Sequence, residues 1–135
     1  MGRFQKLING LYHEGRFQQG VYDELLRGNG RVVPVLMREV IENPNSDVRE
    51  TCAELLRDWK QARAVPALIE ALRDDCEYVR QDALWAIGKL CGFDYGGFEN
   101  LLDVGNTDRP GKLYRRVNEW WEANRRFVEN NPTLW

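Results

Sequence analysis

The sequence is poor in the residues that bind metals or form disulfides. It has one histidine, His13, and three cysteines, Cys52, Cys76 and Cys91, without a Cys-x-x-Cys spacing. An odd cysteine count argues against a disulfide framework, and this set offers too few ligands for a zinc site. We therefore expect no metal or cofactor, a surface or structural His13, buried thiols at Cys52 and Cys91, and a more accessible Cys76.

The sequence also lacks a long apolar run and an excess of charge of one sign. No stretch approaches the roughly 20 apolar residues of a membrane-spanning helix, and the first residues do not resemble a secretory signal. The 19 Lys and Arg residues against 21 Asp and Glu leave a net charge of -2, which provides no basic field for nucleic acid or lipid. The usual catalytic motifs are missing as well. We expect a soluble, cytoplasmic, non-enzymatic protein without a membrane partner.

What the sequence does contain is an internal repeat. Val33-Pro34-Val35-Leu36 is matched by Val65-Pro66-Ala67-Leu68, and Val48-Arg49 is matched by Val79-Arg80, each about 31 or 32 residues further along. Within each copy the apolar residues recur every three or four positions, which predicts a pair of amphipathic helices. The repeat indicates a helical stack.

Turn and capping residues mark where these helices begin. Pro34 and Pro66 fit the start of the first helix of each copy, where a missing N–H costs nothing. Ser46 or Asp47 is expected to cap the second helix of the first copy. The length is that of one domain. We divide it into an N-terminal helical cap at 1–30, repeat 1 at 31–61, repeat 2 at 62–92, and a loop with a C-terminal capping helix at 93–135.

The flanking segments predict further helices. The first should run until Gly15 breaks it, and a second should span about 18–27. A single turn is expected at 98–102, and a last helix from Arg109 or Pro110 to Phe127. The inward residues expected of the first helix are Phe4, Leu7, Ile8, Leu11 and Tyr12. Those expected of the last helix are Leu113, Val117, Trp120, Trp121 and Phe127.

The segment from Val79 to Leu90 resembles the HEAT-repeat pattern of Val-Arg, small residues, an aliphatic-Gly pair and a closing Leu. The segment from Ala64 to Leu72 resembles the first helix of that family, whereas Leu55-Leu56-Arg57 of the first copy lacks the glycine. Together they resemble the short HEAT-like repeats of bacterial and archaeal scaffold proteins and of phycobilin lyases. The resemblance implies an all-α, short α-solenoid with N- and C-terminal capping helices that binds other macromolecules.

The two copies differ at Trp85, which stands where the first copy has Glu54. A large aromatic residue at a position that is usually exposed is typical of a binding surface, and second helices usually line the concave side of a solenoid. We therefore expect a groove for a protein partner. Its predicted residues are Trp85, Gln81, Lys89, Glu50, Glu54 and Arg57. The alternative, that the C-terminal segment covers Trp85, stays open.

Arg49 and Arg80 recur at one position of the repeat. The resemblance implies that each pairs with an acidic residue of an adjacent repeat, and Asp47 and Glu77 are the nearby candidates. We interpret the other acidic residues as solvated or capping groups rather than a catalytic pair. These residues are Glu50, Glu54, Asp58, Asp74, Asp75 and Glu77.

Two further functions compete with that of a scaffold, an adaptor or an immunity-type inhibitor. The resemblance allows a phycobilin-lyase-like protein that handles a tetrapyrrole. The basic residues of the last helix, with Trp120 and Trp121, are the feature that would support nucleic-acid binding, which we do not favour. The sequence identifies no partner and leaves open whether the chain forms a homodimer.

Overall fold

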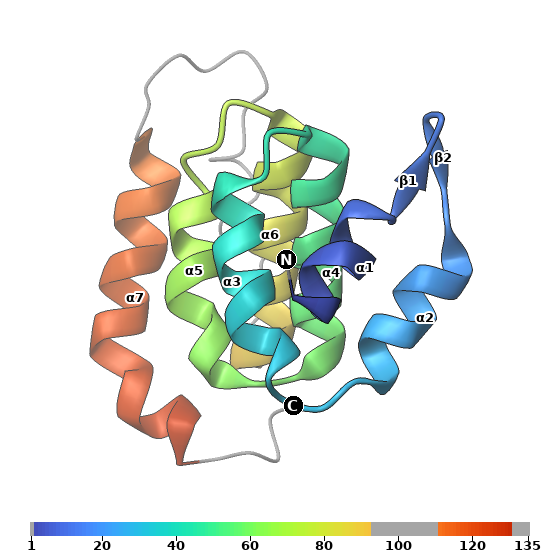
Figure 1. The fold of residues 1–135 in the computed structure, drawn as a ribbon. Coiled ribbons are helices and arrows are strands. Elements are labelled where there is room, and N and C mark those ends of the chain that lie inside the picture. Colours follow the sequence, from blue (N-terminus) through green and yellow to red (C-terminus); the bar gives the residue numbers. More distant parts are fainter. Residues whose placement is uncertain (1, 93–110, 131–135) are drawn as a thin grey trace.

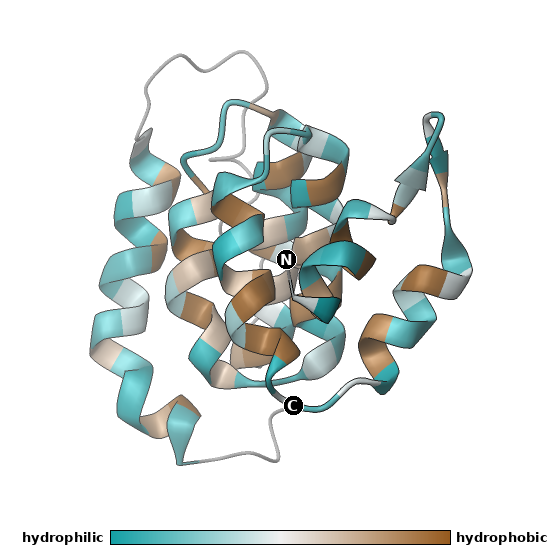
Figure 2. Cartoon of the chain, in the orientation of Figure 1, coloured by the Kyte–Doolittle hydropathy of each residue, from teal (hydrophilic) through white to brown (hydrophobic). Residues whose placement is uncertain are grey.

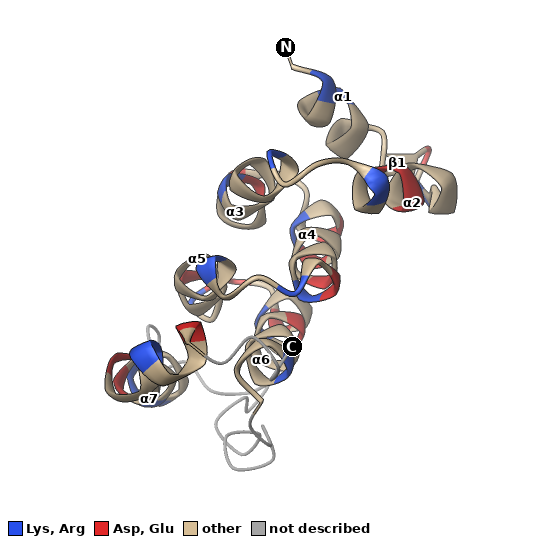
Figure 3. Ribbon diagram, turned by 90° about the horizontal axis from the view of Figure 1, so that it is seen from below, with Lys and Arg blue, Asp and Glu red and all other residues tan. Residues whose placement is uncertain are grey.

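The computed structural model describes residues 2–92 and 111–130, and in them the chain is helical apart from one short hairpin. The helices form two rows, with α1, α3, α5 and α7 in one and α2, α4 and α6 in the other (Figure 3). The prediction of an all-α helical repeat fold is confirmed. The elements are α1 (Arg3–Asn9), β1 (Tyr12–His13), β2 (Arg16–Phe17), α2 (Gln19–Arg27), α3 (Val32–Glu42), α4 (Ser46–Trp59), the 3-10 helix η1 (Ala62–Ala64), α5 (Val65–Ala71), α6 (Glu77–Cys91) and α7 (Gly111–Glu129).

Two helical pairs, α3 with α4 and α5 with α6, form the centre of the stack (Figure 1). The prolines lie in the first turns of α3 and α5, as their sequence positions predict. The cap of α4 is one residue earlier than predicted, because the side chain of Asn45 accepts a hydrogen bond from the backbone N–H of Asp47 at 2.9 Å. At the other end of the second pair, Gly92 ends α6 in the left-handed conformation with φ 73°.

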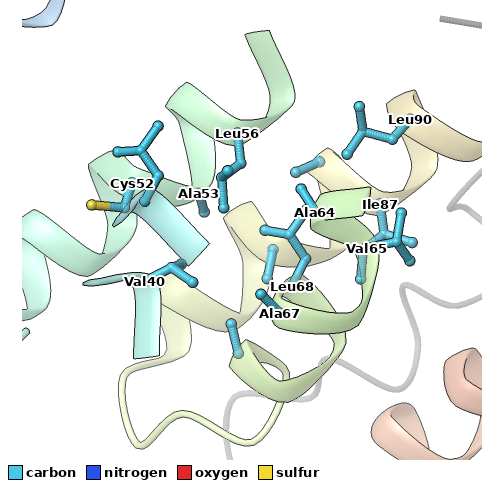
Figure 4. Close-up of a cluster of buried hydrophobic side chains, with 14 of the residues drawn as sticks. Val40, Cys52, Ala53, Leu56, Ala64, Val65, Ala67, Leu68, Ile87 and Leu90 are labelled. Atoms are coloured by element: carbon cyan, nitrogen blue, oxygen red, sulfur yellow. The ribbon is translucent and has the colours of Figure 1, made fainter. Parts of the chain in front are cut away.

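A continuous apolar core lies between the two rows (Figure 2). Figure 4 shows part of this core, to which Val40 of α3, Cys52 of α4, Leu68 of α5 and Ile87 of α6 each contribute a buried side chain. Among the described residues, no helix combines the length and the apolar character needed to cross a bilayer. The core consists mainly of side chains from the stacked helices.

The three cysteines differ in accessibility. Cys52 and Cys91 are buried, whereas Cys76 is partly exposed at the N-terminus of α6. Burial raises the pKa of the Cys91 thiol to about 12 and also raises that of Cys52. Because the thiolate is the reactive form, the two buried thiols are chemically inert at neutral pH.

The first N-terminal helix is shorter than predicted, whereas the second, α2, lies where it was expected. Helix α1 ends at Asn9, and the chain then forms the antiparallel hairpin of β1 and β2. The two residues of its turn, Glu14 and Gly15, have φ values of 51° and 78°. Positive φ at both positions is the geometry that favours a two-residue hairpin with Gly second. Leu11 is buried as expected, but as part of the link into the hairpin.

Helix α7 lies beside α5 and covers that end of the first row (Figure 1). Trp121 is buried, Trp120 is partly exposed, and Phe127, predicted to point inward, is 60% exposed. A step of about 100° per residue places Phe127 roughly a quarter turn from the buried stripe, and Val128 takes the inward position. The turn expected at 98–102 lies outside the described residues.

Arg49 joins the two repeats at their turns. Its Nε and Nη2 donate to the two carboxylate oxygens of Asp74 at 2.8 and 3.1 Å, and its Nη1 donates to the carbonyl of Asn43 at 2.8 Å. The expected partner Asp47 is therefore wrong for this arginine. The Arg49 side chain is 16% exposed and that of Asp74 8%. The bond to Asp74 raises the pKa of Arg49, which keeps the guanidinium charged. We call this pair the Arg49–Asp74 joint.

The second repeat builds its turn in the same way. Asp74 Oδ1 accepts from the backbone N–H of Cys76 at 2.9 Å, as Asn43 Oδ1 accepts from the N–H of Asn45. Arg80 Nη1 donates to the carbonyl of Asp74 at 2.7 Å, the counterpart of the bond from Arg49 to Asn43. Arg80 thus braces its own turn through the backbone carbonyls of Asp74 and Asp75, and within the described residues it does not pair with the expected partner Glu77.

We predict that Arg49→Ala lowers the free energy of unfolding by about 3 kcal/mol, because it leaves the carboxylate of Asp74 buried without its charged partner. Urea unfolding at neutral pH measures the change. Arg3→Ala is the control, since it removes an exposed ion pair with Glu24 and should cost less than about 1 kcal/mol. Equal losses in the two variants would contradict the role assigned to the joint.

Candidate functional site

The six residues predicted for the groove lie on two neighbouring helices of one row. Glu50, Glu54 and Arg57 lie on α4, and Gln81, Trp85 and Lys89 lie on α6. Their spacings of three and four residues place each set on one side of its helix. Lys89 is exposed and the other five are partly exposed. We call these six residues the second-helix strip.

Three carboxylates meet where α4 faces α6. The side chains of Glu50, Glu54 and Asp82 each place an oxygen within 4.8 Å of the others. Asp82 is only 8% exposed, whereas both glutamates are partly exposed. We call these three residues the acidic cluster. The two glutamates were predicted as binding residues, but Asp82 was not. Asp82 lies next to Gln81 in the sequence, along the apolar stripe of α6.

The acidic cluster strongly perturbs the ionisation of its buried member. Burial, followed by the interaction with Glu50, raises the pKa of Asp82 to about 8. Burial also raises the pKa of Glu54. Asp82 Oδ2 is buried and has no hydrogen-bond partner among the described residues. At neutral pH the cluster therefore holds a proton on Asp82, because three adjacent negative charges repel one another in a partly dry environment.

The N-terminal unit, residues 2–28, borders the acidic cluster. Thr51 donates to the carbonyl of Asp47 at 2.9 Å, so that its oxygen accepts from the hydroxyl of Tyr12, also at 2.9 Å. Burial raises the pKa of Tyr12, and the negative charges of Asp47, Glu50 and Glu54 raise it further. These charges act on Tyr12 because the hairpin lies close to the acidic side of α4.

A second phenol fixes α2 on α4. The hydroxyl of Tyr22 donates to Asp58 Oδ2 at 2.7 Å, and Arg57 Nε donates to Asp58 Oδ1 at 3.2 Å. Arg57 therefore supplies positive charge next to Glu54 while one of its nitrogens is held by Asp58. The aromatic rings of Tyr12, Phe17 and Tyr22 are in contact, with centroid separations of 5.7 Å from Phe17 to each tyrosine. One border of the strip is thus aromatic and well anchored.

Trp85 lies one turn beyond Asp82 on α6 and is partly exposed. It therefore presents part of a large apolar surface beside the acidic cluster. The alternative, that the C-terminal segment covers it, falls on 93–110 and 131–135, which lie outside the described residues.

The basic residues of α7 form an exposed face away from the strip. They are Lys112, Arg115, Arg116, Arg125 and Arg126. Trp121 is 2% exposed, so its ring is not available to stack on a base, and Arg125 Nε donates to Glu129 at 3.0 Å. Because Trp121 is buried, Trp120 is the one tryptophan of the predicted nucleic-acid patch that can contact a base.

His13 is exposed on the hairpin.

Fold and turns together define an α-solenoid built from two-helix repeats. The model of the HEAT repeats matches residues 33–109, more than half of the 135 residues, and the chain belongs to this family. HEAT repeats are generally protein-interaction scaffolds and are generally not enzymes. The similarity to phycobilin lyases is not shown. Neither the curated proteins nor the solved structures contained a significant match.

The raised pKa of Asp82 predicts a pH-dependent stability. The folded chain keeps a proton on Asp82 that the unfolded chain, with an ordinary pKa of about 3.9, releases. The contribution of this group to stability therefore falls as pH rises from about 4 to 8, by at most about 1.4 kcal/mol per pH unit. Asp82→Asn cannot ionise, so its stability relative to the wild type should be higher at pH 8 than at pH 5.

Urea unfolding at the two pH values, in buffer containing EDTA, measures this difference. Glu42→Gln, which removes an exposed carboxylate on α3, is the control and should follow the wild type at both pH values. An Asp82→Asn variant whose stability changes with pH as the wild type does would show that Asp82 is ionised in the folded chain.

Proposed function

We propose that this chain is a cytoplasmic, non-enzymatic module that binds a protein partner through the second-helix strip, as a scaffold, an adaptor or an immunity-type inhibitor. The observation that supports this most directly is the combination of a partly exposed Trp85 with the acidic cluster on adjacent helices. Tryptophan is enriched at protein–protein interfaces relative to the rest of the surface. Membership of the HEAT repeats supports the same class of function.

Each part of the strip has a distinct role in the proposed recognition. Trp85 supplies the apolar anchor, because tryptophan is among the residues that dominate binding energy at interfaces. Glu50 and Glu54 offer acceptors, and they favour a partner segment that carries Lys or Arg. Lys89 and Arg57 carry positive charge on the same strip, so the pattern of charges would select one orientation of the partner.

The aromatic border gives the partner a firm edge to pack against. The hydroxyls of Tyr12 and Tyr22 are both bound to α4, so the hairpin and α2 are held in place before binding. Surfaces that are already ordered lose less conformational entropy on association. A partner segment lying along α4 and α6 would therefore meet a largely preformed site.

We predict that Trp85→Ala and Lys89→Glu each weaken binding of the partner tenfold or more, which corresponds to about 1.4 kcal/mol. The partner is first isolated with the wild-type chain as bait and identified by mass spectrometry. The dissociation constants of the purified pair are then measured by calorimetry. Lys89 is exposed, so its replacement tests the strip even if Trp85→Ala disturbs folding.

Ile41→Ser is the matched control. Ile41 is a 46% exposed apolar residue on α3, in the other row of helices, and its loss should leave the affinity unchanged. Circular dichroism verifies that each variant is folded. Wild-type affinity in both strip variants, together with a loss in Ile41→Ser, would move the binding surface to the first row.

A further inference from the structure

The acidic cluster has the geometry of a site for one cation. Glu50 and Glu54 are four residues apart on α4 and so lie on the same face, while Asp82 approaches from α6. Their oxygens lie within 4.8 Å of one another. An ion that binds oxygen ligands at about 2.3 to 2.6 Å can touch three oxygens spaced in this way.

The lack of a hydrogen-bond partner for one buried oxygen of Asp82 is a second, separate indication of a ligand site. Its Oδ2 is buried and has no hydrogen-bond partner among the described residues, although the residue is only 8% exposed. Other acidic residues near the turns and on α4 are well paired: Asp74 binds Arg49, and Asp58 binds Tyr22 and Arg57. Buried polar atoms are nearly always paired in folded proteins, so this oxygen is available to accept a ligand in the cluster.

The donor atoms decide which kind of cation fits. All three are carboxylate oxygens, with no nitrogen or sulfur in the cluster, and this donor set suits hard divalent ions rather than zinc or copper. The scarcity of Cys and His residues excludes a zinc site, but it does not exclude a site whose ligands are oxygens. The two glutamates are partly exposed, so water can complete the coordination.

We propose that Glu50, Glu54 and Asp82 bind one hard divalent cation, of which Ca²⁺ is the representative, between α4 and α6. The ion displaces the proton that Asp82 holds in its absence, and its charge offsets the repulsion among the three carboxylates. Because its ligands come from both repeats, binding also links α4 to α6. The proposal concerns the isolated chain and does not depend on the protein partner.

Terbium luminescence tests the site directly. Tb³⁺ replaces Ca²⁺ at oxygen ligands, and Trp85, one turn from Asp82 on α6, is placed to transfer excitation energy to it. We expect a saturable signal at one Tb³⁺ per chain that excess Ca²⁺ removes. Calorimetry with Ca²⁺ should give a dissociation constant of about 10⁻⁴ to 10⁻³ M, the weak end of the range that ligand charge and site rigidity set, because the chain supplies only three carboxylates.

The ligands are tested one by one. Asp82→Asn and Glu54→Gln should each weaken Tb³⁺ and Ca²⁺ binding at least tenfold, while Glu42→Gln, an exposed carboxylate on α3, should bind as the wild type does. Ca²⁺ should also raise the Tm of the wild type and of Glu42→Gln, but not that of Asp82→Asn. This second readout needs no fluorescence from Trp85.

Three results would overturn the proposal. The first is the lack of a saturable signal and of a Ca²⁺-dependent Tm in the wild type, which would leave a shared proton as the only group that satisfies the cluster. The second is unchanged binding in folded Asp82→Asn and Glu54→Gln. The third is binding lost equally in Glu42→Gln, which would indicate diffuse attraction to surface carboxylates.

Discussion

The Arg49–Asp74 joint sets the register of the two repeats. One guanidinium binds the carbonyl of Asn43 in its own turn and the carboxylate of Asp74 in the next turn. A planar guanidinium meets a carboxylate through two parallel bonds in one orientation, so the pair restricts both the rotation and the shift of one turn against the other. Because α4 and α6 begin directly after these turns, the joint also determines which of their outward residues face each other.

The architecture could be predicted because two independent patterns indicate it. The period of the apolar residues indicates helices, and the internal repeat indicates that pairs of helices stack. Shorter features escaped prediction for physical reasons. Two-residue strands such as Tyr12–His13 have too little pattern to compete with the apolar spacing of a helix, and Leu11 is buried in either conformation. Phe127 was misplaced because Phe127 and Val128 are neighbours near the edge of the apolar stripe, and only the folded chain shows that Val128 is the buried one.

The candidate site was predictable only in part. The outward positions of α4 and α6 follow from the period of each helix, which is why Glu54 and Trp85 could be selected. Asp82 became significant only when α4 was placed opposite it, since its cluster joins residues about 30 positions apart. The same limit applies to Asp74 as the partner of Arg49. The period of a helix specifies which face is outward, but the neighbour that this face meets depends on stacking.

The N-terminal unit is attached to the first repeat by specific polar contacts. Its two phenols bind Thr51 and Asp58, polar groups that belong to α4, whereas repeat-to-repeat contacts are largely apolar. Helices that meet through similar apolar faces can be exchanged or duplicated, but a joint made by particular hydroxyl and carboxylate groups accepts one neighbour. The N-terminal unit is therefore specific for the repeat that carries Thr51 and Asp58, whereas a joint made only of apolar faces would not distinguish one repeat from another.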